Sequence, residues 1–180
     1  MRMTVLLACC ALGCATASNS DPDAPTHEVV KRTLGPGETL DLTRQTVIRA
    51  GDYRAEPGRV WTELLAVGAQ LGLPVQSSDS STGMIVFHLP ASTGRIAGRP
   101  ASDWIECGRA AGGLPRAETY QITLSLTAVV SPGEQVATHV RTSLVAYARE
   151  RGTGNAGLPC SSTGRLEQHL LTTVGARVAT

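Results

Sequence analysis

The sequence predicts an α+β domain in which a curved antiparallel sheet of about four to six strands is packed by two amphipathic helices. Residues 119–130 alternate between apolar and polar side chains, which is typical of a strand with one buried and one solvated face. Residues 57–72 and 163–178 carry apolar side chains at helical spacing. Because each element has a single apolar face, packing both helices against the sheet would bury all three faces.

The expected element order is β-α-β-β-β-β-α, within one domain that spans residues 27–180. One or two short strands fall in 38–50, where apolar residues alternate before a Gly-Asp pair breaks the pattern. Residues 75–78 and 84–89 are two short strand-like runs separated by polar residues and glycine. We expect these two runs to form a hairpin.

The helix ends are marked by their own signals. Pro57 suits the first turn of the first helix, and Gly72 followed by Pro74 is typical of its end. Ser162 or Thr163 can cap the second helix.

The strand 119–130 is followed by a Ser-Pro-Gly-Glu turn and by a second alternating segment, 135–149. These two segments are expected to pair. Residues 90–118 and 150–161 show no periodicity and are expected to form two long loops at one end of the sheet, and loops of this length are often functional.

The N-terminal residues resemble the signal sequence of a bacterial lipoprotein. Arg2 supplies a positive charge, residues 4–12 form a short apolar run, and Gly13 places a small residue before Cys14. The run is too short to cross a bilayer of about 30 Å as a helix. The resemblance implies that residues 1–13 are removed and that Cys14 is lipidated as the new N terminus.

Two alternatives to this processing remain open. The Leu-Leu-Ala-Cys segment that ends at Cys9 also fits the lipoprotein pattern, and ordinary cleavage after Ala15 or Ala17 would give a periplasmic protein without an anchor. Residues 14–26 are small, polar and interrupted by proline, so we expect a disordered tether. Ala15 directly after the lipidated cysteine favours the outer membrane, with the domain facing the periplasm.

Charge and composition argue against a nucleic-acid partner. Of 16 basic and 15 acidic residues, one basic residue lies in the signal, so the mature chain is formally neutral. Lys31 is the single lysine, and there is no basic stripe of the kind that nucleic-acid binding requires. Only six aromatic residues are present, so the core must consist mainly of Val, Leu, Ile and Ala.

The cysteine count predicts a disulfide. Once Cys14 is lipidated and the signal is removed, Cys107 and Cys160 are the two remaining thiols, and a pair of thiols in an oxidising compartment is most simply a disulfide. Such a bond would stabilise the fold by about 4 kcal/mol in the chain-entropy model. Two free thiols or a metal site are the alternatives, but neither cysteine has a ligand partner at zinc-binding spacing.

No motif predicts catalysis, a cofactor or a metal. Residues 152–157 match GxGxxG but do not open directly into a helix, so a turn-rich loop is expected there. The Ser-Thr-Gly triplets at Ser81, Ser92 and Ser162 lack the GxSxG context of a nucleophile and suit turns or caps. The histidines show no metal-ligand spacing and are expected at the surface, although folding can still bring two of them together: His27, His88, His139 and His169.

One long loop is the first candidate for a partner or ligand site. It carries Arg95, Arg99, Arg109 and Arg116 together with Trp104. Arginine beside an exposed aromatic ring suits an anionic headgroup, a glycan or a protein partner. The alternative is a solvated loop with Trp104 packed beneath it.

Residues 57–65, with the sequence PGRVWTELL, are similar to the first-helix entry of helix-grip domains, including the START and polyketide-cyclase-like group. A terminal amphipathic helix, 163–178, fits the same pattern. The length is similar to the smaller module in the accessory lipoprotein of the outer-membrane β-barrel assembly machinery. The resemblance implies that an apolar ligand can be held between the sheet and the last helix.

These observations together predict a non-enzymatic, lipid-anchored cell-envelope protein that acts as an accessory, scaffold or partner-binding domain facing the periplasm. The first alternative is a periplasmic carrier that holds a lipid or another apolar ligand between the sheet and the C-terminal helix. The second is a hydrolase that acts on envelope material, for which the sequence shows no nucleophile and base pair.

Overall fold

The computed structural model describes residues 26–35, 38–134, 136–152 and 157–180, and only the backbone is described for the strands within 26–46. The elements, in chain order, are β1 (Thr26–Gly35), β2 (Glu38–Thr46), β3 (Ile48–Tyr53), α1 (Pro57–Gln70), β4 (Val75–Asp79), β5 (Met84–Thr93), β6 (Arg95–Ile96), β7 (Arg99–Pro100), the 3-10 turn η1 (Ala101–Asp103), β8 (Ile105–Glu106), α2 (Arg116–Thr119), β9 (Gln121–Pro132), β10 (Thr138–Arg149), β11 (Leu158–Ser162) and α3 (Arg165–Val178).

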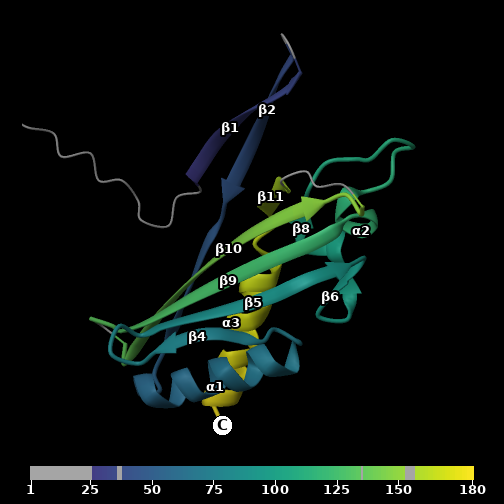
Figure 1. The fold of residues 1–180 in the computed structure, drawn as a ribbon. Helices are drawn as coiled ribbons and strands as arrows, with labels where there is room; N and C mark the ends of the chain where they lie inside the picture. Colours follow the sequence, from purple (N-terminus) through teal and green to yellow (C-terminus); the bar gives the residue numbers. More distant parts are fainter. Residues whose placement is uncertain (1–25, 36–37, 135, 153–156) are drawn as a thin grey trace, which may run out of the picture.

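Seven antiparallel strands form the main sheet, in the order β4-β5-β9-β10-β11-β8, with β3 also paired to β10 (Figure 1). The strand β10 has two partners along one edge. Its first half, from Thr138 to Ser143, pairs with β3, and Ala146 to Ala148 pair with β11. The segments that precede α1 and α3 are therefore neighbours on the same side of β10.

The helices α1 and α3 cover the same face of this sheet. Tyr53, whose side chain points to this face from β3, donates a hydrogen bond of 2.9 Å to the Leu171 carbonyl of α3. Gly68 of α1 lies directly against the ring of Phe87 on β5. The side chains between the two layers form one hydrophobic core, which includes Val60, Leu64, Val67, Phe87, Leu124, Leu126, Leu144, Leu166, Leu170 and Val174. The α+β architecture predicted from the sequence is confirmed.

On the opposite face of the sheet, the strand β9 carries short, uncharged side chains. On β9 the residues that alternate with the core are Thr123, Ser125, Thr127 and Val129, and these are partly or fully exposed. The sequence alternation of this strand therefore matches its burial: every second residue from Ile122 to Val130 is buried.

The first two strands form a separate antiparallel hairpin, in which Thr26 pairs with Thr46. The hairpin extends past one end of the main sheet (Figure 1), and β2 runs beside β11. The predicted tether, 14–26, lies outside the described residues except for its last residue.

Several sequence predictions of local structure were wrong. β3 continues through Gly51 and Asp52, where a break was expected. The expected loops 90–118 and 150–161 contain β8 and β11, among other short elements, so the main sheet has seven strands where four to six were expected. Strands of two to five residues show too few alternations for a period of two to be recognised.

The other strand and helix predictions agree with the structure, except for the cap of the second helix: the N-cap residue of α3 is Gly164, with no side-chain cap hydrogen bond, where Ser162 or Thr163 was expected. The hairpin of β4 and β5 and the pairing of β9 with β10 are observed, and both helices begin and end within two residues of the predicted bounds. Among the described residues no helix is long and apolar enough to cross a membrane. Cys14 and the predicted signal lie outside the described residues.

Candidate functional site between the cap and the C-terminal helix

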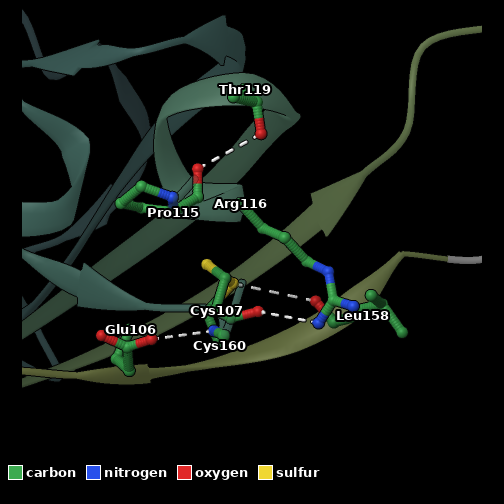
Figure 2. Close-up of a disulfide and its surroundings, with 8 residues drawn as sticks. Glu106, Cys107, Pro115, Arg116, Thr119, Leu158 and Cys160 are labelled. Carbon is green, nitrogen blue, oxygen red and sulfur yellow. Dashed lines mark hydrogen bonds between the residues drawn. A yellow bond between two sulfur atoms is a disulfide. The ribbon is translucent and has the colours of Figure 1, made fainter. Parts of the chain in front are cut away.

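Residues 95–119, from β6 to α2, form a small substructure at one end of the sheet, which we call the cap. Its strand β8 pairs with β11, so that Glu106 lies opposite Ser161 and Ile105 opposite Ser162. The next residues along these two strands, Cys107 and Cys160, are joined by the disulfide that the cysteine count predicts (Figure 2). The bond therefore fastens the cap to the strand that leads directly into α3.

Arg116 supports this junction from the side of α2. Its Nη1 donates a hydrogen bond of 3.5 Å to the Cys107 carbonyl (Figure 2), and its guanidinium lies 6.0 Å from the centre of the Tyr120 ring. Its Nε is buried and has no hydrogen-bond partner among the described residues. Arg116 is thus part of the cap's internal packing.

Trp104 is a packing residue. The side chain is 3% exposed, and the indole Nε1 donates a hydrogen bond of 2.8 Å to the Ile96 carbonyl. This satisfies the one polar atom of a buried indole. Of the two interpretations that the sequence left open for this loop, the structure shows the tryptophan packed beneath it.

Thr163 connects the cap to the start of α3. Its amide donates to the Trp104 carbonyl at 3.0 Å, and its hydroxyl lies 2.9 and 3.0 Å from the carbonyl oxygens of Trp104 and Asp103. The disulfide and these contacts hold the cap and α3 in a fixed relative position.

A cleft of about 330 Å³ lies between the cap and α3. The Arg99 guanidinium is 5.3 Å from the centre of the Trp104 ring, and its Nε and Nη2 each lie 2.9 Å from Asp103 Oδ2. The ring of His169 stacks on Trp104, with 6.0 Å between the ring centres. The lining residues are Arg99, Asp103, Trp104, Arg165, Gln168, His169 and Thr172.

The cleft carries an excess of positive charge. Arg99 and Asp103 form an ion pair, so their charges compensate each other. Arg165 is exposed and makes no ion pair or hydrogen bond through its side chain within the described part of the chain. With His169 counted as neutral, the residues that line the cleft therefore carry a net charge of about one positive unit, from the Arg165 guanidinium.

Of the five cap residues predicted from the sequence, two line the cleft: Arg99 and Trp104. The other three do not. Arg95 donates to the Gly98 carbonyl, Arg109 donates to the Gly113 carbonyl at 2.6 Å, and Arg116 packs beside the disulfide.

Sequence reasoning missed the contribution of α3 to this site. Arg165, Gln168, His169 and Thr172 follow the spacing i, i+3, i+4 and i+7, which places them on one face of a helix. A polar stripe of this kind is a signal in the sequence, but nothing there indicates that a distant loop faces it.

The described histidine and Ser-Thr-Gly side chains lie apart from one another or make structural hydrogen bonds. His88 Nδ1 lies 3.1 Å from Ser125 Oγ on the open face of the sheet, and no described carboxylate contacts this histidine. His139 Nδ1 lies 2.6 Å from Asp52 Oδ1. The Ser162 hydroxyl is buried and bonded to Glu167. Within the described ranges no group of three or more His, Cys, Asp or Glu residues is placed to hold a metal ion.

A comparison of the chain with protein-family models and with curated proteins finds no match.

Proposed function

We propose that this chain is a non-enzymatic, lipid-anchored cell-envelope domain that binds a protein partner through the cleft between the cap and α3. The observation that carries the proposal is a charged, solvent-open cleft whose two walls are fastened together by the Cys107–Cys160 disulfide and by Thr163. A rigid frame lowers the entropy cost of binding, because the contact residues are already in place.

The anchor part of the proposal rests on the sequence alone. Arg2, the apolar run 4–12 and the small residue before Cys14 match the order of a lipoprotein signal. Two or more acyl chains on Cys14 would hold the domain stably at a membrane surface, since each buried methylene contributes about 0.8 kcal/mol.

The packing between sheet and helices favours partner binding over the carrier function. A carrier of the helix-grip kind would hold its ligand between the sheet and α3. At this interface Leu64, Phe87, Leu126, Leu144 and Leu170 are at most 2% exposed and belong to one continuous core. An apolar ligand would have to displace side chains that are close-packed in the folded domain.

The hydrolase alternative would depend on Ser125 and His88. A serine nucleophile needs a base in hydrogen-bond contact and a third group that orients the base. His88 supplies the contact, but its second nitrogen has no carboxylate partner among the described residues. This pair therefore fits a surface hydrogen bond better than an activated nucleophile.

The proposal is tested by crosslinking in the native envelope. A photoreactive amino acid is placed at Thr172, inside the cleft, and at Thr62, an exposed position on α1, as the matched control. We expect one discrete crosslinked protein from position 172 and none from position 62. The same pattern of adducts from both positions, or no adduct from position 172, would contradict the proposal.

Native mass spectrometry separates the two non-enzymatic functions. A partner-binding domain is expected at the mass of the lipidated chain alone after extraction in mild detergent. A co-purified apolar molecule that remains after exchange of the detergent would instead favour the carrier.

A further inference from the structure

We propose that the cleft binds a single carboxylate of an acidic segment of the partner, with Arg165 as the residue that pairs with it. The inference deepens the proposed function and rests on it, because it names the chemistry that the cleft would recognise in the partner. It is carried by the charges, contacts and positions of the residues that line the cleft.

The charge of the lining matches one monoanion. Asp103 accepts two contacts of 2.9 Å from the Arg99 guanidinium, so Arg99 has a fixed carboxylate partner within the protein. The other arginine of the lining, Arg165, has no carboxylate partner among the described residues. A carboxylate would neutralise this charge, whereas a phosphate dianion would leave a negative charge in the cleft.

The position of Arg165 is unfavourable for the helix itself. Arg165 is the first residue of α3, a helix of 14 residues, and the positive end of the helix dipole disfavours a cation there. The one acidic residue in this first turn, Glu167, is buried on the inner side of α3 and forms no ion pair with Arg165 in the described part of the chain. The structure shows no contact through which the Arg165 side chain would stabilise α3. Its positive charge would, however, add to the attraction of the N-terminal end of the helix for an anion.

The remaining lining can hold neutral groups that flank the carboxylate. Gln168 Nε2 donates a hydrogen bond of 3.2 Å to Thr172 Oγ1. The hydroxyl hydrogen of Thr172 and the side-chain carbonyl oxygen of Gln168 therefore remain available for hydrogen bonds to a bound ligand. Trp104 and His169 supply the aromatic part of the lining, with their rings stacked. Amide and hydroxyl groups beside an aromatic surface suit a peptide backbone.

The probe is a terminally blocked pentapeptide with the sequence Gly-Ser-Glu-Ser-Gly, compared with the same peptide carrying Gln or phosphoserine at its centre. Each peptide is titrated into the ¹⁵N-labelled, lipidated protein in nanodiscs, and the indole resonance of Trp104 is followed by NMR. The protein variants are Arg165→Gln and, as a matched control from the cap but outside the cleft, Arg109→Gln.

We expect the Glu peptide to bind about tenfold more tightly than the Gln peptide, because the Gln amide can still accept a hydrogen bond from Arg165 but lacks the negative charge that strengthens this bond. The variant Arg165→Gln should remove this difference, and Arg109→Gln should retain it. The carboxylate proposal is overturned if the Glu and Gln peptides bind equally, if no peptide shifts the Trp104 resonance up to about 10 mM, if phosphoserine binds more tightly than Glu, or if both protein variants lose binding alike.

The two proposals fail in distinguishable ways. If crosslinking from Thr172 yields a specific partner but the peptides do not discriminate by charge, the partner proposal stands and the ligand chemistry is wrong. If the Thr172 crosslink is also absent, the function proposed for the cleft is wrong as well.

Discussion

The Ser162 hydroxyl donates a hydrogen bond of 2.6 Å to Glu167 Oε1 at the buried start of α3. Ser162 Oγ also accepts a bond of 2.9 Å from the Gly164 amide, so one hydroxyl connects the end of β11 to the first turn of the helix. Glu167 is fully buried, and its Oε2 has no hydrogen-bond partner among the described residues. A carboxyl group is therefore held in the core with only part of its hydrogen-bonding capacity used.

Replacing Glu167 by Gln should stabilise the protein by about 1 kcal/mol or more at pH values above the folded-state pKa of Glu167, because an ionised carboxylate is costly to bury. Burial raises the pKa of Glu167 above its usual value of 4.5, while the Ser162 hydrogen bond and the charge of Arg49 partly oppose this rise. The folded state then holds its proton more tightly than the unfolded chain. This contribution to stability is fully present below the unfolded pKa and is lost as the pH rises through the folded pKa.

The measurement is urea unfolding of the wild type and of Glu167→Gln over a series of pH values from about 4.5 upward. The exposed Glu106 provides the matched control as Glu106→Gln. The wild type and the control should both lose stability with rising pH relative to Glu167→Gln. Parallel pH profiles for all three proteins would contradict the assignment to Glu167.

Loss of the disulfide should lower the free energy of unfolding by about 4 kcal/mol in the chain-entropy model, because Cys107 and Cys160 are 53 residues apart. The double variant Cys107→Ser/Cys160→Ser, compared with the oxidised and the reduced wild type in guanidinium unfolding, checks this value. Reduced wild type and the double variant should unfold at similar midpoints. An unchanged midpoint on reduction would mean that the cap is held by its other contacts alone.

Gly83→Ala should be strongly destabilising, and Gly72→Ala should be only mildly so. Both glycines have a positive φ, 68° and 71° respectively, which costs an alanine about 1 kcal/mol or more. A Cβ at Gly83 would lie 2.0 Å from the Val130 carbonyl oxygen, whereas at Gly72 nothing lies within 4 Å. The melting temperatures of the two variants separate the clash with Val130 from the backbone strain that both variants share. Equal melting temperatures would show that the turn before β5 can shift away from β9.

Extraction of the protein from its native membrane should give an intact mass that begins at Cys14 and includes acyl chains. Reduction should raise this mass by about two hydrogens if the Cys107–Cys160 bond is present in the cell. Cys14→Ser should release the chain from the membrane fraction. A mass that begins at Thr16 or Ser18, without lipid, would favour ordinary signal cleavage.

The long strands and helices could be predicted from the sequence because each one carries a periodic pattern of apolar residues. The alternation of Ile122, Leu124 and Leu126 and the helical spacing of Leu166 and Leu170 both coincide with burial in the structure. The hairpin of β4 and β5 was predicted instead from two short runs around a polar turn, and β4 itself is exposed throughout. The periodic segments each bury one face, and the period of that face is set by local backbone geometry.

The secondary structure of short and irregular segments could not be predicted from the sequence. β8 and β11 have two and five residues, and they are strands because they pair with each other and, for β11, with β10. Their partners lie ten or more residues away along the chain, and no local pattern encodes such a pairing. The same holds for Trp104, whose burial follows from the packing of the cap.

The sequence by itself determined the α+β class, the two long helices, the near-neutral formal charge of the chain and the pairing of its last two cysteines. The tertiary structure decided which polar residues share a site. It brought Arg99 of the cap to Arg165 and His169 of α3 and left Arg95 and Arg109 outside the cleft. The physical reason is that periodicity reports which face of an element is buried, whereas a cleft depends on the long-range contacts that join distant elements.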